Sequence, residues 1–140
     1  MFSDASGFSL KTFYFGRYSN PLINNDLFYT VQISCSKPKF ATPYLIDKTL
    51  EAAYPIGVVG NGYNKNEFEQ VYRKILDRNE ELIKWELNII DFIANHYNKY
   101  PVLLCFENLS SGKSFCHREI LAQWITEKKI ARTEELYDTI

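Results

Sequence analysis

The segment that decides the fold is a short apolar strand followed by a loop and a helix. Residues 102–106 read Val-Leu-Leu-Cys-Phe, and residues 114–125 read Ser-Phe-Cys-His-Arg-Glu-Ile-Leu-Ala-Gln-Trp-Ile. A continuous apolar run of this length predicts a strand that is covered on both faces, as in α/β proteins. Ser114 is a candidate N-cap, and the apolar residues after it recur at helical spacing. We therefore expect a strand, a loop and a helix in this part of the chain.

The rest of the chain predicts further strands and helices before and after this unit. They are strands at 11–16 and 27–34, a short helix at 44–53, a helix capped by Asn64 or Asn66, a helix from about Glu80 that ends before Pro101, and a short helix at 133–137. The apolar stripe of the helix from Glu80 consists of Ile83, Leu87, Ile90, Ala94 and Tyr97. This order predicts one α/β domain over residues 1–140, in which helices pack on a small, mostly parallel sheet in a Rossmann-like three-layer arrangement.

Charge and cysteine content limit the possible partners and surroundings. The chain has 16 Lys and Arg against 17 Asp and Glu, so it lacks the basic excess that is usual in nucleic-acid-binding proteins, although a local basic patch stays open. No apolar run approaches the ~20 residues of a membrane helix, and the N-terminus does not resemble a signal peptide. The three cysteines, Cys35, Cys105 and Cys116, are odd in number and far apart. We expect reduced thiols, a cytoplasmic location and no membrane partner.

Aromatic residues make up 16% of the chain, which is unusually many. Burial in the predicted strands and helices explains most of them. It leaves six unexplained, which are Tyr14, Tyr18, Phe28, Tyr29, Phe106 and Phe115. Such rings either fill the core or wall a cleft, and an exposed group of them would suit a homodimer surface.

The candidate site lies where the strand at 102–106 ends, because ligands collect at the carboxyl ends of strands in open α/β sheets. Glu107 follows this strand, and Cys116, His117 and Arg118 lie where the next helix should begin. A helix start and neighbouring positive charges favour the thiolate form of a cysteine. We therefore expect Cys116, Glu107 and His117 to be the candidate catalytic residues, with Glu107 as a general base.

Positive and polar residues around the same place predict an anion-binding site. Arg118 offers a planar guanidinium fork for phosphate or carboxylate, and the helix start offers backbone donors. Lys113 and Ser114 precede the helix, and Arg17 follows a predicted strand. We expect these four residues to bind the ligand.

Structural interpretations of the same residues stay open. Cys105 suits a buried core thiol, and Glu107 and Arg118 suit an ion pair that joins the loop to the helix. Cys105, Cys116 and His117 contain no Cys-x-x-Cys pair and no clear fourth ligand, which argues against zinc. The sequence identifies no cofactor.

Residues 101–107 and 115–124 resemble the domain-of-unknown-function family 488. Its members share a strand ending in Cys-x-Glu, a short loop, and Cys-His-Arg at the start of the last helix, as at Cys105 to Glu107 and Cys116 to Arg118 here. The resemblance implies an α/β fold and a shared site, and it implies no particular reaction. Many members carry Asp-Val-Arg after the second strand, where this chain has residues 33–35, Ile-Ser-Cys.

Two classes of function follow from these observations. The first is a binder or enzyme for a nucleotide-like or other phosphorylated small molecule at the Glu107 and Cys-His-Arg site. The alternative is a non-enzymatic interaction or regulatory module, of the phage or mobile-element type, in which Cys116, His117 and Arg118 are structural. A nucleic-acid-binding accessory protein is a third candidate, and the balanced charge argues against it.

Overall fold

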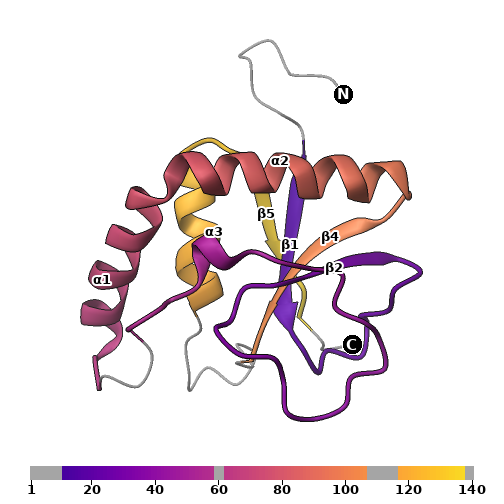
Figure 1. The fold of residues 1–140 in the computed structure, drawn as a ribbon, viewed down its shortest axis with the longest axis horizontal. Coiled ribbons are helices and arrows are strands. Elements are labelled where there is room, and N and C mark those ends of the chain that lie inside the picture. Colours follow the sequence, from indigo (N-terminus) through magenta and orange to yellow (C-terminus); the bar gives the residue numbers. More distant parts are fainter. Residues whose placement is uncertain (1–10, 59–61, 107–116, 138–140) are drawn as a thin grey trace.

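A computed structural model of the protein describes residues 11–58, 62–106 and 117–137. A five-stranded, all-parallel sheet forms its centre, with the strand order β3-β2-β4-β1-β5 (Figure 1). The strands are β1 (Thr12–Arg17), β2 (Phe28–Gln32), β3 (Lys48–Thr49), β4 (Tyr100–Cys105) and β5 (Arg132–Glu135). The predicted α/β class and the parallel sheet are thus confirmed.

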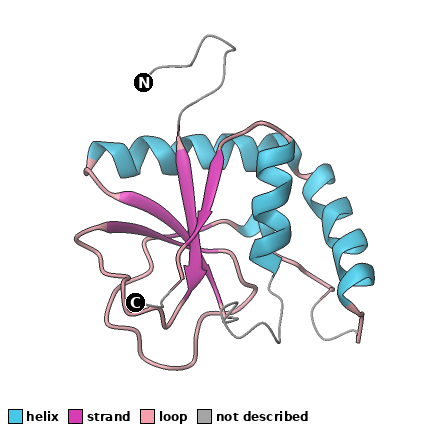
Figure 2. Cartoon of the chain, turned by 180° about the vertical axis from the view of Figure 1, so that it is seen from behind, coloured by secondary structure: helices cyan, strands magenta, loops and turns pink. Residues whose placement is uncertain are grey.

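Three helices pack on one face of this sheet: α1 (Lys65–Arg78), α2 (Glu80–His96) and α3 (His117–Glu127). Helices α1 and α3 stand side by side, and α2 runs across the end of the sheet where β1 begins (Figures 1 and 2). Leu103 of β4 lies in the core with the helices, whereas Val102 and Leu104 lie in a second cluster with Ile23 and Tyr44. The molecule therefore has three layers, and the third layer consists of loop segments instead of helices.

Local sequence signals explain how α1 and α2 begin and which sides they bury. Asn64, one of the two predicted caps, accepts a hydrogen bond from the Glu67 backbone N–H, and the Glu67 carboxylate accepts one from the Asn64 N–H. This reciprocal capping box satisfies two donors at the helix start. Four members of the predicted α2 stripe are fully buried, but Tyr97 is exposed because the helix ends at His96.

Two predicted helices are wrong, because pairing with the sheet decides the local structure. Residues 44–53 contain the short strand β3 and a 3-10 turn, η1 (Glu51–Ala53), since Asp47 and Leu50 donate backbone hydrogen bonds to Thr30 and Gln32 of β2. The segment predicted as a helix at 133–137 instead pairs with β1 as the edge strand β5.

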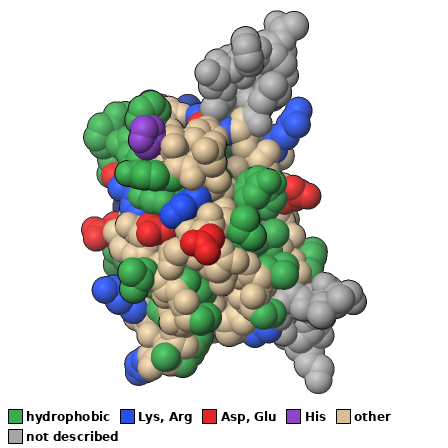
Figure 3. Space-filling model, turned by 90° about the vertical axis from the view of Figure 1, so that its right-hand side faces the viewer, with side chains coloured by type: hydrophobic (Ala, Val, Ile, Leu, Met, Phe, Trp, Pro, Cys, Tyr) green, Lys and Arg blue, Asp and Glu red, His purple; other side chains and the backbone are tan. Residues whose placement is uncertain are grey.

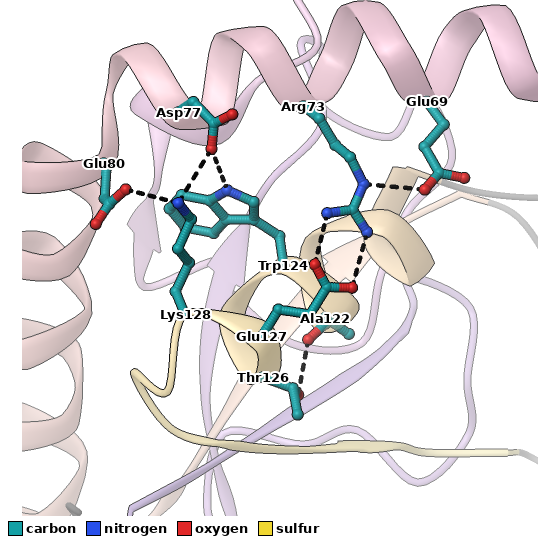
Figure 4. A network of polar contacts seen from close by, with 9 residues as sticks. All are labelled: Glu69, Arg73, Asp77, Glu80, Ala122, Trp124, Thr126, Glu127 and Lys128. Carbon is teal, nitrogen blue, oxygen red and sulfur yellow. Dashed lines mark hydrogen bonds and ion pairs between the residues drawn. The ribbon is translucent and has the colours of Figure 1, made fainter.

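Polar contacts join the three helices on their outer side (Figure 4). Arg73 of α1 binds Glu127 of α3 through two hydrogen bonds of 2.9 and 3.2 Å. The Trp124 indole donates to Asp77 at 2.9 Å, and Lys128 lies 3.1 Å from Glu80 of α2. These contacts hold α3 against α1, and therefore fix where the start of α3 meets the sheet.

Candidate functional site

The carboxyl ends of β1 and β4 lie side by side where the chain leaves the sheet in two directions. Arg17 at the end of β1 is in register with Cys105 at the end of β4. The chain after β1 passes over the loop-covered face, where Tyr18 and Ile23 are buried, whereas β4 is followed by α3 on the helix-covered face. Neighbouring strands whose connections depart to opposite faces leave a crevice that commonly binds ligands in open α/β sheets.

Three of the seven predicted site residues lie within the described residues, and all three are at this edge. Arg17 ends β1, and His117 and Arg118 form the start of α3. The other four predicted site residues lie outside the described residues: Glu107, Lys113, Ser114 and Cys116.

Arg118 is a buried arginine whose guanidinium is bound within the fold. It is 1% exposed, and its Nε and Nη2 donate to the Glu135 carboxylate of β5 at 3.0–3.2 Å. Its Nη1 donates to the Cys105 Sγ at 3.1 Å. Burial raises the pKa of Glu135 more than the neighbouring Arg118 lowers it. Sequence reasoning missed Glu135, because it falls in a segment that was predicted to be helical.

His117 connects the start of α3 to the end of β2. Its ring is 7% exposed, and Nε2 donates to the Ile33 carbonyl at 2.8 Å. The Tyr72 ring packs edge-on against it at 5.5 Å between ring centres. Burial, together with the neighbouring Arg118, lowers the His117 pKa to about 4, although the hydrogen bond to Ile33 acts in the opposite direction. The imidazole is therefore neutral at pH 7, with its proton on the nitrogen that binds Ile33.

Arg17 shares the helix-covered face with Arg118. Side chains alternate along a strand, so Arg17 lies on the same face as the buried Phe13 and Phe15. Its Nη1 donates to the Ser19 hydroxyl at 2.6 Å. Arg17 and Arg118 thus approach Cys105 from β1 and α3, and Glu135 pairs with Arg118. Glu119 of α3 is close enough to raise the Glu135 pKa, so two arginines face two carboxylates in this group.

The loop-covered side of the same edge has a polar group that sequence reasoning missed. The Tyr18 and Ser34 hydroxyls are 2.6 Å apart, and the Gln32 Nε2 donates to the Ser34 carbonyl at 2.9 Å. The Gln32 Oε1 is buried and has no hydrogen-bond partner among the residues described. Burial raises the Tyr18 pKa to about 12, so its hydroxyl stays protonated. An acceptor in this setting is costly unless something binds it.

The cysteines differ from the expectation of three reduced thiols. Cys35 is free and exposed, and burial raises its pKa. Cys105 is fully buried, as a core thiol would be, but it is disulfide-bonded. The expectation of a reduced thiol is therefore wrong for Cys105.

The aromatic rings of the first two strands fill the core. Tyr18 and Phe28 are buried in the cluster under the loop-covered face, and Tyr14 and Tyr29 are partly buried against the two clusters. Phe106 packs edge-on against Tyr18 with 5.0 Å between ring centres. The sixth ring of the predicted group, Phe115, lies outside the described residues.

No metal centre and no membrane span is found within ranges 11–58, 62–106 and 117–137. No three His, Cys, Asp or Glu side chains there are grouped so that they could hold a metal ion. No helix in these ranges has both the length and the apolar character to cross a membrane.

The fold and this edge define the chain as a parallel α/β protein with arginines at the carboxyl ends of its central strands. Comparison of the chain with protein-family models, with curated proteins and with solved structures finds no match in any of the three.

Proposed function

We propose that this protein binds a small phosphorylated, nucleotide-like ligand at the carboxyl ends of β1 and β4. The observation that carries the proposal is the approach of Arg17 and Arg118 to Cys105 on one face of the sheet, at the crevice between these strands. Guanidinium groups are well suited to phosphate, and the start of α3 adds the positive end of a helix dipole.

The contacts of the two arginines give them different roles in the proposed site. Arg118 is held by Glu135 and Cys105, so it adds positive charge from within the fold and positions the start of α3. Arg17 is the less buried of the two and is the direct ligand contact. The buried Gln32 Oε1, on the other side of the edge, accepts a hydrogen bond from the ligand.

The remaining assignments come from the sequence. Lys113 and Ser114 add donors to the phosphate between β4 and α3. Glu107 acts as a general base or binds a ribose hydroxyl. His117, neutral and bound to Ile33, keeps the first turn of α3 at the sheet.

A thermal-shift panel tests the proposal. The full chain is heated with nucleoside monophosphates, nucleoside diphosphates and sugar phosphates, each compared with its unphosphorylated parent at equal ionic strength. A ligand present at 100 times its dissociation constant stabilises the folded state by about 2.7 kcal/mol. For a chain of this size that corresponds to a rise of roughly 5–10 °C in the melting temperature. We expect this rise with at least one phosphorylated compound and not with its parent, and no rise with any compound contradicts the proposal.

The engagement of Arg118 and His117 within the fold favours a second candidate. In a non-enzymatic interaction or regulatory module, these two residues only join α3 to β5 and β2. That candidate predicts no ligand stabilisation in the panel, while substitution of Arg118 still lowers the melting temperature.

A further inference from the structure

We propose that the outer side of α2 is a homodimer interface, on which α2 packs antiparallel to α2 of a second copy of this chain. Helix α2 carries a second apolar stripe besides the one that faces the core. Its apolar members are Leu82, Trp85, Ile89 and Phe92, and His96 continues the same spacing. They follow one another at intervals of three and four residues, which is the heptad spacing of helices that pair along a seam.

This outer stripe lies on the side of α2 opposite the core stripe. At 100° per residue, the mean direction of this outer stripe lies about 150° from the mean direction of Ile83, Leu87, Ile90 and Ala94, which are fully buried. Trp85 is 61% exposed and Phe92 is 72% exposed. The core therefore accounts for one side of α2 and leaves large apolar side chains on the other.

The apolar surface is of the size that a dimer needs. The stripe is ~21 Å long, and its exposed side chains, Leu82, Trp85 and Phe92, offer roughly 400 Å². A standard interface buries ~800 Å² per partner, of which ~60% is apolar, so the two areas agree. Figure 3 shows hydrophobic side chains gathered beside an exposed histidine at the end of the molecule where α2 finishes.

Charge at the two ends of α2 favours the antiparallel direction. The Glu81 side chain at the start of the helix is 90% exposed, at 3.7 Å from Lys84, and Lys99 follows the end of the helix. In a twofold arrangement centred on Ile89, Trp85 packs against the partner's Phe92, and Glu81 approaches the partner's Lys99. A parallel pair would instead bring the two acidic ends together and align the helix dipoles unfavourably.

Sedimentation velocity of the full chain from about 1 to 100 μM tests the interface. We expect a concentration-dependent dimer, and we expect Phe92→Glu to be a monomer with an unchanged far-ultraviolet circular dichroism spectrum. The matched control is Leu45→Glu, which places the same charge on an exposed leucine of the loop layer and should keep the dimer. A wild-type chain that is monomeric throughout the range, or a Phe92→Glu variant that still dimerises, overturns the proposal. A monomer that floats with phosphatidylcholine vesicles would also overturn it, because a lipid surface would then be the occupant.

A charge exchange tests the direction of the helices. Glu81→Lys and Lys99→Glu should each weaken the dimer, by up to about fivefold for a rim ion pair. The double variant should restore the wild-type dissociation constant, because the two charges then face each other with exchanged signs. A double variant weaker than both single variants overturns the antiparallel arrangement.

Discussion

At the scale of single residues, His117 makes the stability of the fold depend on pH. Its pKa is about 4 in the folded chain, below the ordinary value of 6.5, so folding favours the neutral ring. The contribution of His117 is therefore complete above pH 6.5 and is lost as the pH falls through 4. A shift of this size corresponds to roughly 3 kcal/mol.

This dependence can be measured by urea unfolding between pH 7.5 and pH 4. We expect the wild-type free energy of unfolding to fall as the pH drops, and the His117→Gln variant to lose most of that slope. The raised pKa of Glu135 acts in the opposite direction, because a protonated Glu135 is favoured in the fold, so the difference between the two chains isolates His117. Equal slopes in wild type and His117→Gln would show that the histidine is not buried as described.

The Arg118 and Glu135 pair gives a second prediction at this scale. Removal of one partner of a buried ion pair leaves the other charge uncompensated, which costs about 3–5 kcal/mol. Arg118→Met should therefore lower the free energy of unfolding at pH 7 by about 3 kcal/mol, because Glu135 keeps some access to solvent. Adding Glu135→Leu should recover most of this loss in urea denaturation. Additive losses in the double variant would mean that the two side chains do not form a pair.

The sequence predicts some residues of the candidate site and not others. Arg17, His117 and Arg118 were predictable because they stand next to the ends of strongly apolar elements. Glu135 was not, because its closeness to Arg118 depends on how β5 pairs with β1. Gln32 was not either, because an unpartnered acceptor can be recognised only when its surroundings are known.

At the scale of elements, the capping box of α1 shows which of two candidate caps begins the helix. Asn64 and Asn66 each have a glutamate three residues later, but the box forms between Asn64 and Glu67, whereas Glu69 pairs with Arg73. Asn64→Ala should lower the free energy of unfolding by about 1 kcal/mol in urea denaturation. Asn66→Ala, at the second residue of the same helix, is the matched control and should lower the free energy of unfolding by less. A larger loss of stability in Asn66→Ala than in Asn64→Ala would show that Asn64 is not the N-cap.

Long periodic elements were predictable, and short ones that depend on neighbours were not. The helices α1 and α2 and the strand β4 have enough apolar residues at one spacing to identify them. Strand β3 has two residues and is held by backbone bonds from Asp47 and Leu50 to the β2 region. Strand β5 is a polar segment, Arg-Thr-Glu-Glu, that becomes a strand because β1 has an open edge.

At the scale of the whole molecule, strand order determines where a ligand would bind. The α/β class follows from the order of elements along the chain, but β4 lies between β2 and β1, and no local pattern predicts that position. The insertion of β4 beside β1 brings Arg17 to Cys105 and, through α3, to Arg118. The central claim is that the site formed by Arg17, Cys105 and Arg118 binds a phosphorylated ligand.

Calorimetric titration of the phosphorylated compound that stabilises the chain most tests this claim directly. The comparison is between wild type, Arg17→Gln and Arg132→Gln, because Arg132 is an exposed arginine at the opposite, amino end of β5. A charge-assisted hydrogen bond contributes about 1.5–3 kcal/mol, so Arg17→Gln should weaken binding by at least tenfold. Arg132→Gln should bind like wild type. Equal weakening by both substitutions, or none by Arg17→Gln, would contradict a ligand site at the ends of β1 and β4.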